Sequence, residues 1–406
     1  MKPSLNPNQN LLDKNLTYLV AVSFGPDSMA LLHWLHAQGY QLRVAHVNYH
    51  LRPESDLEQS ALEQYCFQYD VPLDVLDVKN FPSGNRQDVA RTIRYEFFQQ
   101  LVKEYRLAGV ITAHHQDDDL ETAMLQEQRG KHYMYYGIRP VSTWREMTVI
   151  RPLLPLPKAT LLTYCKEAKI PYAIDASNLK PIYARNRVRF ALAKLSPQRR
   201  MEQLLHFQNL NQQLEKQKTI LAPFVHQHNL SIQTYLGWDE TSQFLYWHGA
   251  MHHRHIHIPI TQTFLKKVHQ VIQSKKPNHA FKLRTDPEWW VMKAYSRLYL
   301  VQSDWLKPYR FDTPKEPIDL YLLKLYPNRL KNIPTSFILR SAQPTDRIKI
   351  KDYHKSFRRL AIDWKMPMFL RSIWPVIIDA KQQIIYLPRY QKNPTFQANN
   401  WLEILE

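Results

Sequence analysis

Short apolar runs and helical segments alternate along the first 128 residues of the chain. β-rich apolar runs cover residues 18–22, 42–47, 73–78 and 109–113, and segments with apolar residues at helical spacing cover 29–37, 56–69, 88–105 and 118–128. Strands that alternate with helices predict an α/β fold with a doubly wound, mostly parallel sheet. Ligands of such sheets bind beyond the carboxyl ends of the strands, so a site is expected in the loops that follow them.

The pattern changes after residue 128. Residues 129–148 predict a loop with strand character, 158–168 a helix, 175–189 a polar loop that enters another helix, and 192–228 a helical stretch rich in Gln. Residues 229–335 mix helix and strand signals, whereas alternating apolar positions from 338 onward indicate a small β-rich domain. We therefore expect three parts: a catalytic domain at 1–195, a helical or mixed middle region at 196–335 and a small domain at 336–406.

The charge of the chain points to a polyanionic partner. Its 406 residues include 54 Lys and Arg against 36 Asp and Glu, a net charge of +18. Such a surface favours nucleic acid, because each neutralised phosphate releases condensed counterions. An anionic membrane surface, or a charge that serves only solubility, is the alternative.

The sequence argues against zinc-knuckle, redox, membrane-spanning and secreted proteins. Cys66 and Cys165 are far apart and form no CxxC pair, so neither a zinc-knuckle nor a redox spacing is present. No run of eighteen apolar residues occurs, and the polar N-terminus lacks the apolar core of a signal peptide. A cytoplasmic protein is expected.

The loop after the first apolar run carries the first candidate chemistry. It reads Ser23-Phe24-Gly25-Pro26-Asp27-Ser28 and leads into a helix. Backbone N–H groups at a helix N-terminus, together with two hydroxyls, can hold a phosphate or pyrophosphate, and Asp27 can hold Mg²⁺ or a cationic substrate beside it. No Gly-Lys-Ser/Thr ends the loop, so it is not a Walker loop. A plain Asp-Ser helix start without a ligand is the alternative.

An acidic segment after the fourth run is the strongest signal in the sequence. It contains His114, His115 and three consecutive aspartates, and Asp118 and Glu121 lie three residues apart at a predicted helix start. Both carboxylates can then face one point, where they could neutralise a bound ammonium group. A metal site and a simple acidic helix cap are the other interpretations.

Basic residues recur at spacings that suit phosphates. Arg91 and Arg94 lie on one face of a predicted helix, although such a pair can also be a solvated basic face. Arg185, Arg187 and Arg189 form a second cluster, which read alone fits a basic helix cap equally well. A third group includes Arg358 and Arg359, with Tyr353, Phe357 and Trp364 interleaved, and could bind RNA by charge and stacking.

The first loop resembles the Ser-Gly-Gly-x-Asp-Ser pyrophosphatase loop of the N-type ATP pyrophosphatases, the PP-loop family. Those enzymes cleave ATP to AMP and pyrophosphate and adenylate a carbonyl oxygen of their substrate. Phe24 stands where the family has its first Gly. If that position needs a positive φ, Phe is strained by roughly 1–2 kcal/mol; if it is extended, Phe costs little.

Further motifs resemble one branch of that family, the tRNA(Ile)-lysidine synthases. The segment from His46 to Arg52 is similar to His-Val-Asn-His-x-Leu-Arg, with Tyr49 in place of the second His. Residues 90–95 match Ala-Arg-x-x-Arg-Tyr, and residues 112–122 match Thr-Ala-His-His-x-Asp-Asp-x-x-Glu-Thr. The resemblance covers about residues 18–190 well and 338–376 moderately.

The resemblance implies a two-step reaction that uses ATP and Mg²⁺. The C2 oxygen of cytidine 34 in a CAU-anticodon isoleucine tRNA is adenylated, and the ε-amine of L-lysine then displaces AMP. By this resemblance Asp27, Arg91, His114 and Asp117 are catalytic, and Asp118 and Glu121 bind lysine. Residues 23–28 and His46 would bind ATP, with Asp27 also a metal ligand. The expected tRNA-binding residues are Arg94, Arg185, Arg187, Arg189, Arg358 and Arg359.

Three rival functions remain at this point. A tRNA thiolase would share the ATP loop, but Cys66 and Cys165 match no thiolase motif. An amidotransferase-type synthetase for a small molecule would leave the +18 charge unexplained. An RNA-binding protein with a decayed loop is favoured only by Phe24. The sequence leaves the oligomeric state open, a homodimer included.

Overall fold

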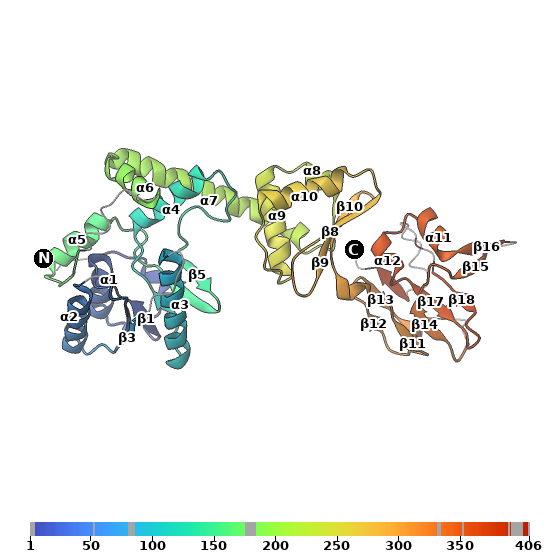
Figure 1. Ribbon diagram of the computed structural model, residues 1–406, viewed down its shortest axis with the longest axis horizontal. Helices are drawn as coiled ribbons and strands as arrows, with labels where there is room; N and C mark the ends of the chain where they lie inside the picture. The colour runs from blue at the N-terminus through green and yellow to red at the C-terminus, as the bar shows by residue number, and fades with distance from the viewer. Residues whose placement is uncertain are drawn as a thin grey trace. The chain divides into compact units, whose positions relative to one another are not determined.

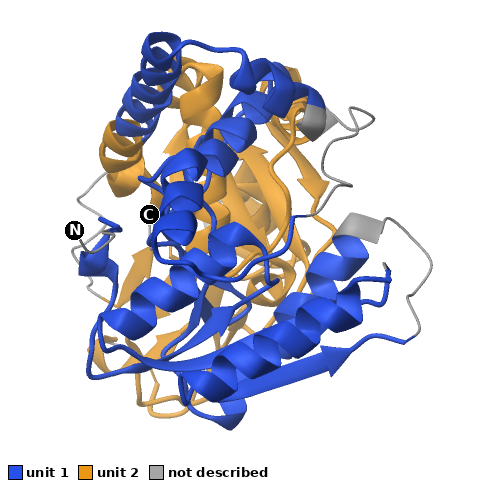
Figure 2. Ribbon diagram, turned by 90° about the vertical axis from the view of Figure 1, so that its left-hand side faces the viewer, with its two compact units in different colours: residues 1–214 blue, residues 215–406 orange. Residues whose placement is uncertain are grey.

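The computed structural model separates the chain into two compact units, residues 1–214 and 215–406 (Figure 2). It describes residues 5–51, 53–79, 86–174, 184–330, 334–350, 353–388, 390 and 401–404. Each unit is described by itself. The finer division that the sequence suggests, at residues 195 and 335, stays a prediction.

Unit 1 is built on a six-stranded sheet with the order β3-β2-β1-β4-β6-β5. The strands are β1 (Thr17–Ala21), β2 (Gln41–Asn48), β3 (Leu73–Asp77), β4 (Val110–Ile111), β5 (Val141–Trp144) and β6 (Met147–Ile150). All neighbours pair in parallel except β5, which is antiparallel to β6. The predicted α/β class with a mostly parallel sheet is confirmed, and the predicted strand character of 129–148 belongs to the β5–β6 hairpin.

Helices cover both faces of this sheet, because alternate strand residues point to opposite sides. Val20 packs with α1 (Pro26–Ala37), α2 (Ser55–Gln68) and α5 (Lys158–Glu167), whereas its neighbour Leu19 packs with α3 (Arg86–Glu104). The strand order reverses at β1, which lies between β2 and β4. The loops after β1 and β4 therefore leave the sheet side by side, at the switch point where such folds bind ligands.

Three further helices make a separate layer within unit 1. They are α4 (Gln116–Gln128), α6 (Ala184–Ala193) and α7 (Pro197–Val225), drawn in cyan to green in Figure 1. A small apolar cluster joins them; its buried members are Leu120, Ala123, Val188, Leu192 and Phe207. The α7 helix continues past residue 214 into unit 2.

Unit 2 begins with helices packed on a four-stranded antiparallel sheet. The helices are α8 (Ile232–Leu236), α9 (Glu240–His253) and α10 (Gln262–Gln273). The strands are β7 (Asn229–Ser231), β8 (Asn278–Lys282), β9 (Trp289–Ala294) and β10 (Arg297–Gln302), in the order β7-β10-β9-β8. This region, whose sequence gave mixed signals, contains both kinds of element.

The C-terminal part of unit 2 is rich in short antiparallel strands, as the alternating pattern predicts. One sheet has the order β11-β14-β17-β18, from Arg310–Asp312, Ile338–Ser341, Pro375–Ile378 and Ile384–Tyr386. A second contains β12 (Ile318–Asp319), β13 (Leu323–Leu325) and β19 (Leu402–Ile404). A hairpin of β15 (Arg347–Ile350) and β16 (Tyr353–Ser356) leads into α11 (Phe357–Asp363), and α12 (Met368–Arg371) follows.

Among the residues that the structure describes, no helix is both long and apolar enough to cross a membrane. Both cysteines are buried: Cys66 lies in α2 and Cys165 in α5. They contribute to the core that surrounds α1.

Candidate active site

The loop after β1 is held by the two serines that the sequence singles out. The Ser28 hydroxyl donates to the Gly25 carbonyl at 3.0 Å and accepts from the Ser23 N–H at 3.2 Å. Gly25 is the residue before α1, and Pro26 occupies the first helical turn, where its missing N–H costs nothing. The loop therefore presents the positive end of α1 at the edge of the sheet, an arrangement that binds phosphate.

Phe24 adopts the left-handed conformation that favours glycine. Its φ is 59°, and its ring is 5% exposed among the apolar side chains around α1. The Phe24 carbonyl accepts from the N–H of Ala173 at 2.9 Å. The position thus needs a positive φ, the strained alternative of the two considered, and the buried ring offsets the strain.

The side chain of His46 lies beside the start of this loop. It lies in β2, is 5% exposed, and its Nδ1 lies 2.9 Å from the Val22 carbonyl. Burial lowers the pKa of His46, although the bond to Val22 opposes the shift. A neutral ring that donates from Nδ1 to Val22 ties the end of β2 to the start of the phosphate loop.

Two predicted side chains, Asp27 and Asp118, meet at His115, the residue just before α4. His115 is the N-cap: its Nδ1 accepts from the Asp118 N–H at 3.4 Å, while Asp118 Oδ2 accepts from the His115 N–H at 3.2 Å. His115 Nε2 lies 3.5 Å from Asp27 Oδ2 and 3.4 Å from Asp118 Oδ2. One imidazole therefore joins the phosphate loop to the acidic segment.

The electrostatics of this cluster favour charged carboxylates beside a basic ring. Burial alone would raise the pKa of Asp27, but His115 and then Lys158 lower it. Burial alone would lower the pKa of His115, but Asp27, Asp118 and Asp117 raise it. Lys158 Nζ lies 3.5 Å from Asp27 Oδ2 and supplies a second positive charge.

The two carboxylate oxygens of Asp27 have different surroundings. Its Oδ1 is buried and makes no hydrogen bond within the described part of the chain. A buried carboxylate oxygen without a donor is a fit place for a cation. No group of three or more metal-ligating side chains occurs among the described residues, which suits Mg²⁺ held by one or two carboxylates together with phosphates and water.

Asp117 lies at the edge of this cluster, with its Oδ2 3.8 Å from His115 Nδ1, and also contacts the starts of two further helices. It accepts from the backbone N–H of Lys158 at 2.8 Å and from Arg200 at 2.5 Å. Burial would raise its pKa, but these two partners and His115 lower it. Asp117 therefore anchors the starts of α5 and α7 to α4.

Glu121 lies deeper and is paired. Its side chain is 2% exposed, and it accepts two hydrogen bonds from Arg189 on α6, at 2.7 and 3.2 Å. The bond to Glu121 is the main cause of the raised pKa of Arg189. The structure thus joins a residue predicted to bind lysine with one predicted to bind tRNA.

The remaining predicted residues have other surroundings. His114 Nδ1 lies 2.8 Å from the Thr112 hydroxyl, and the Arg91 guanidinium lies 4.5 Å from the centre of the Tyr95 ring. Arg94 lies on α3 with Arg91, and Arg187 is exposed on α6.

Arg358 and Arg359 belong to unit 2 and are exposed, with Arg359 3.5 Å from Asp363. The side chain of Arg185 and residues 175–183 lie outside the described part.

Asp119 is a titratable group that the sequence did not single out. It accepts from the Ile138 N–H at 2.5 Å and so ties α4 to the loop before β5. Burial raises the pKa of Asp119 to about 6, and the charge of Asp118 adds to the shift although the Ile138 bond opposes it.

Comparison with known proteins identifies the family of the chain. Residues 4–196 match the family model of the PP-loop domain. A tRNA(Ile)-lysidine synthase of Mesoplasma florum is 27% identical over 92% of this chain and 98% of its own length. One of Mycoplasma pneumoniae is 40% identical over 46% of this chain and 64% of its own. The chain belongs to the tRNA(Ile)-lysidine synthases of the PP-loop family.

Other similar proteins extend the comparison. A Listeria innocua protein named bifunctional TilS/HprT is 28% identical over 92% of this chain, which spans 65% of that longer protein. Among solved structures, the U34-tRNA thiolase NcsA of Methanococcus maripaludis aligns with 50% of this chain and 75% of its own, at a TM-score of 0.43 and 15% identity. In this chain, Phe24 of the phosphate loop adopts the left-handed backbone conformation.

Substitutions at Phe24 should separate strain from packing. Phe24→Ala removes the buried ring but keeps the strained φ, whereas Phe24→Gly removes both. We expect both to lower the free energy of unfolding in urea, with Gly less destabilising than Ala by roughly 1 kcal/mol. Phe98, buried in α3, is the matched control: there Gly should be worse than Ala by about 1 kcal/mol. The same order at both positions would contradict a strained Phe24.

Asp119 should make stability depend on pH. Its folded pKa lies above the unfolded one, so ionisation costs the folded state progressively more as pH rises through the range from about 4 to 6. We expect Asp119→Asn to stabilise the protein by roughly 1–2 kcal/mol more at pH 7.5 than at pH 4.5, measured by urea unfolding. Asp117→Asn should show no such gain between these pH values, because the lowered pKa of Asp117 puts its titration below about pH 4. Parallel pH profiles for wild type and Asp119→Asn would refute this.

Proposed function

We propose that this protein joins L-lysine to C2 of the wobble cytidine of a CAU-anticodon isoleucine tRNA at the expense of ATP. The observation that carries the proposal is the contact of the phosphate loop with the acidic start of α4, through His115, Asp27 and Asp118. That contact brings the N-terminal end of α1 next to two carboxylates, in a chain similar to a tRNA(Ile)-lysidine synthase over 92% of its length.

The first step would form a bond between the C2 oxygen of cytidine and the α-phosphorus of ATP, with pyrophosphate as the leaving group. The free N–H groups of the first turn of α1 and the Ser23 and Ser28 hydroxyls would hold the phosphates. Mg²⁺, if held at Asp27 Oδ1, would neutralise charge on the leaving pyrophosphate. Arg91 on α3 is proposed to add a further positive charge there.

The second step would use the ε-amine of lysine to attack C2 and break the bond to the AMP oxygen. Lysine arrives as an ammonium and must lose a proton before it attacks. Asp118 and Glu121 are proposed to attract the ammonium, and His115, beside Asp118, is a neighbouring group that can exchange a proton. Since Arg189 occupies Glu121, lysine would have to share or displace that guanidinium.

Positive charge suits the RNA partner. The +18 net charge, the exposed Arg187 on α6 and the exposed Arg358 on α11 support proposed phosphate contacts in both units. The predicted roles of Arg94, Arg185, Arg189 and Arg359 remain part of this proposal.

The two buried cysteines do not favour a thiolase that transfers sulfur. Burial raises the pKa of Cys66 to about 12 and that of Cys165 to about 11. Such thiols are protonated at neutral pH and buried, whereas sulfur chemistry needs an accessible thiolate.

The deciding measurement is AMP release from α-labelled ATP with Mg²⁺, unmodified isoleucine tRNA and lysine, each omitted in turn. We expect full AMP release only when tRNA and lysine are both present. Asp27→Asn should lower the rate by about 100-fold or more, because it removes the proposed metal ligand and its charge. AMP without RNA would indicate a small-molecule synthetase, and RNA binding without AMP would indicate a binding protein with an inactive loop.

Asp118→Asn should test the lysine site. The amide keeps an oxygen to accept the His115 N–H but loses the charge, so we expect the KM for lysine to rise by roughly 10- to 100-fold. The Kd for tRNA should change less than twofold. Asp119→Asn is the matched control, because that side chain faces Ile138, and its KM for lysine should stay near wild type. An equal loss of tRNA affinity in Asp118→Asn would argue against this role.

A further inference from the structure

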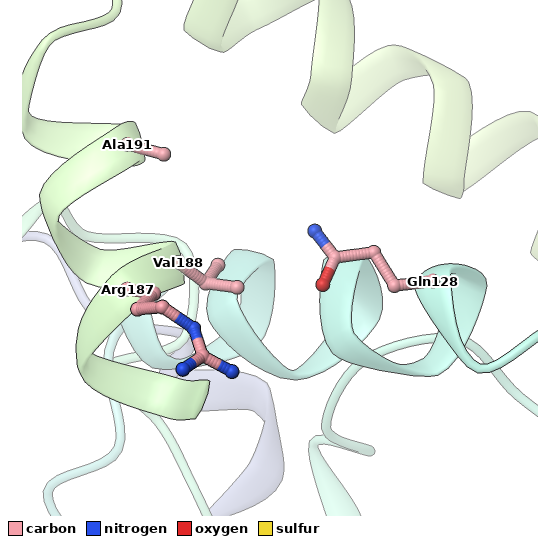
Figure 3. A pocket seen from close by; sticks show the side chains of 4 residues that line it. All are labelled: Gln128, Arg187, Val188 and Ala191. Atoms are coloured by element: carbon pink, nitrogen blue, oxygen red, sulfur yellow. The ribbon is translucent and has the colours of Figure 1, made fainter. Parts of the chain in front are cut away.

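A pocket of about 190 Å³ opens between α4 and α6, outside the cluster around His115. The described residues that line it are Gln128 at the end of α4, and Arg187, Val188 and Ala191 on α6. Figure 3 shows the Gln128 carboxamide and the side chains of α6 around one space. No role in the two-step reaction proposed above involves Gln128, Val188 or Ala191.

The base of this pocket is buried in the apolar packing of the helices, and its edges are exposed. Val188 is 4% exposed and belongs to the apolar cluster that joins α4, α6 and α7. Gln128, Arg187 and Ala191 are exposed. The pocket is therefore supported by packing that exists without a ligand, which reduces the cost of binding.

The pocket shares the helices α4 and α6 with the proposed reaction site. Gln128 lies seven residues after Glu121 on the same helix, which places both on one face about 10 Å apart. Arg187 lies two residues before Arg189, the partner of Glu121. A strand of RNA that runs along α4 from the neighbourhood of Glu121 would bring an adjacent base to this pocket.

The chemistry of the lining suits a flat heterocycle. A carboxamide can donate and accept at the edge of a base, a guanidinium plane can stack on its face, and apolar Val188 and Ala191 can contact the ring. Among the described residues, the lining includes one positive and no negative side chain, which favours a nucleotide over a cationic ligand. The volume is below the roughly 300–1,000 Å³ of pockets that enclose a whole small-molecule ligand, and it suits one ring system.

We propose that this pocket receives one unstacked nucleobase of the RNA substrate, a neighbour of the cytidine that is modified. Gln128 would contact the edge of that base and Arg187 its face. The proposal rests on the proposed function, because it needs an RNA whose reacting base lies near Glu121. It assigns a base contact to Arg187, in addition to any contact with phosphate.

The first test compares variants of the full chain in AMP release with tRNA and lysine. Gln128→Ala and Arg187→Ala should each raise the KM for tRNA by roughly 5- to 50-fold, with kcat within twofold of wild type. Arg129→Ala is the matched control, because it removes the same charge next to Gln128 without lining the pocket, and it should raise KM less than threefold. Equal effects of Arg187→Ala and Arg129→Ala, with none from Gln128→Ala, would overturn the proposal in favour of general charge attraction.

The second test identifies the base. Transcripts with a single abasic nucleotide at each position flanking the cytidine are compared in wild type and Gln128→Ala. At one position the abasic nucleotide should raise KM in wild type but add less than about twofold in Gln128→Ala, since the contact is already lost. If every abasic RNA loses as much in the variant as in wild type, no base occupies the pocket. Failure of the proposed function looks different, because wild type would then release no tRNA-dependent AMP.

Discussion

The contact of His115 with two carboxylates holds the candidate site together. Asp27 and Asp118 come from different elements, and their like charges would repel each other in a partly buried site. The imidazole between them, with Lys158 beside Asp27, makes the approach favourable. Because the same ring caps α4, the orientation of that helix and the electrostatics of the phosphate loop depend on one side chain. The cluster can accept a further cation, since one oxygen of Asp27 has no donor in the part of the chain that the structure describes.

Much of unit 1 could be predicted from local patterns. β1 and β2 alternate with helices of clear periodicity, and a parallel sheet with chemistry at its carboxyl edge follows from general rules of packing. The region from 229 to 302 could not be predicted with equal clarity. Strands such as β7 are three residues long, and their stability comes from antiparallel partners distant in sequence rather than from a local pattern.

The candidate site was predictable as a set of segments but not as a set of contacts. Asp27, Asp118 and Glu121 stand out by charge and spacing, and the motif places them near one another. Nothing local indicates that Arg189 pairs with Glu121 across 68 positions, or that Arg200 pairs with Asp117 across 83. Likewise, adjacent histidines do not reveal which ring caps α4. These facts depend on how α6 and α7 pack against α4, which only the folded chain determines.

The conformation of Phe24 has an evolutionary consequence. Its backbone suits glycine, yet its ring fills space among side chains from several elements around α1. A return to glycine by a single change would relieve the backbone and leave a void, and the surrounding residues would have to enlarge to close it. The ring and its neighbours therefore constrain one another, because a change on either side alone leaves a void or a clash. Descendants of this chain should keep an aromatic residue there for as long as those neighbours persist.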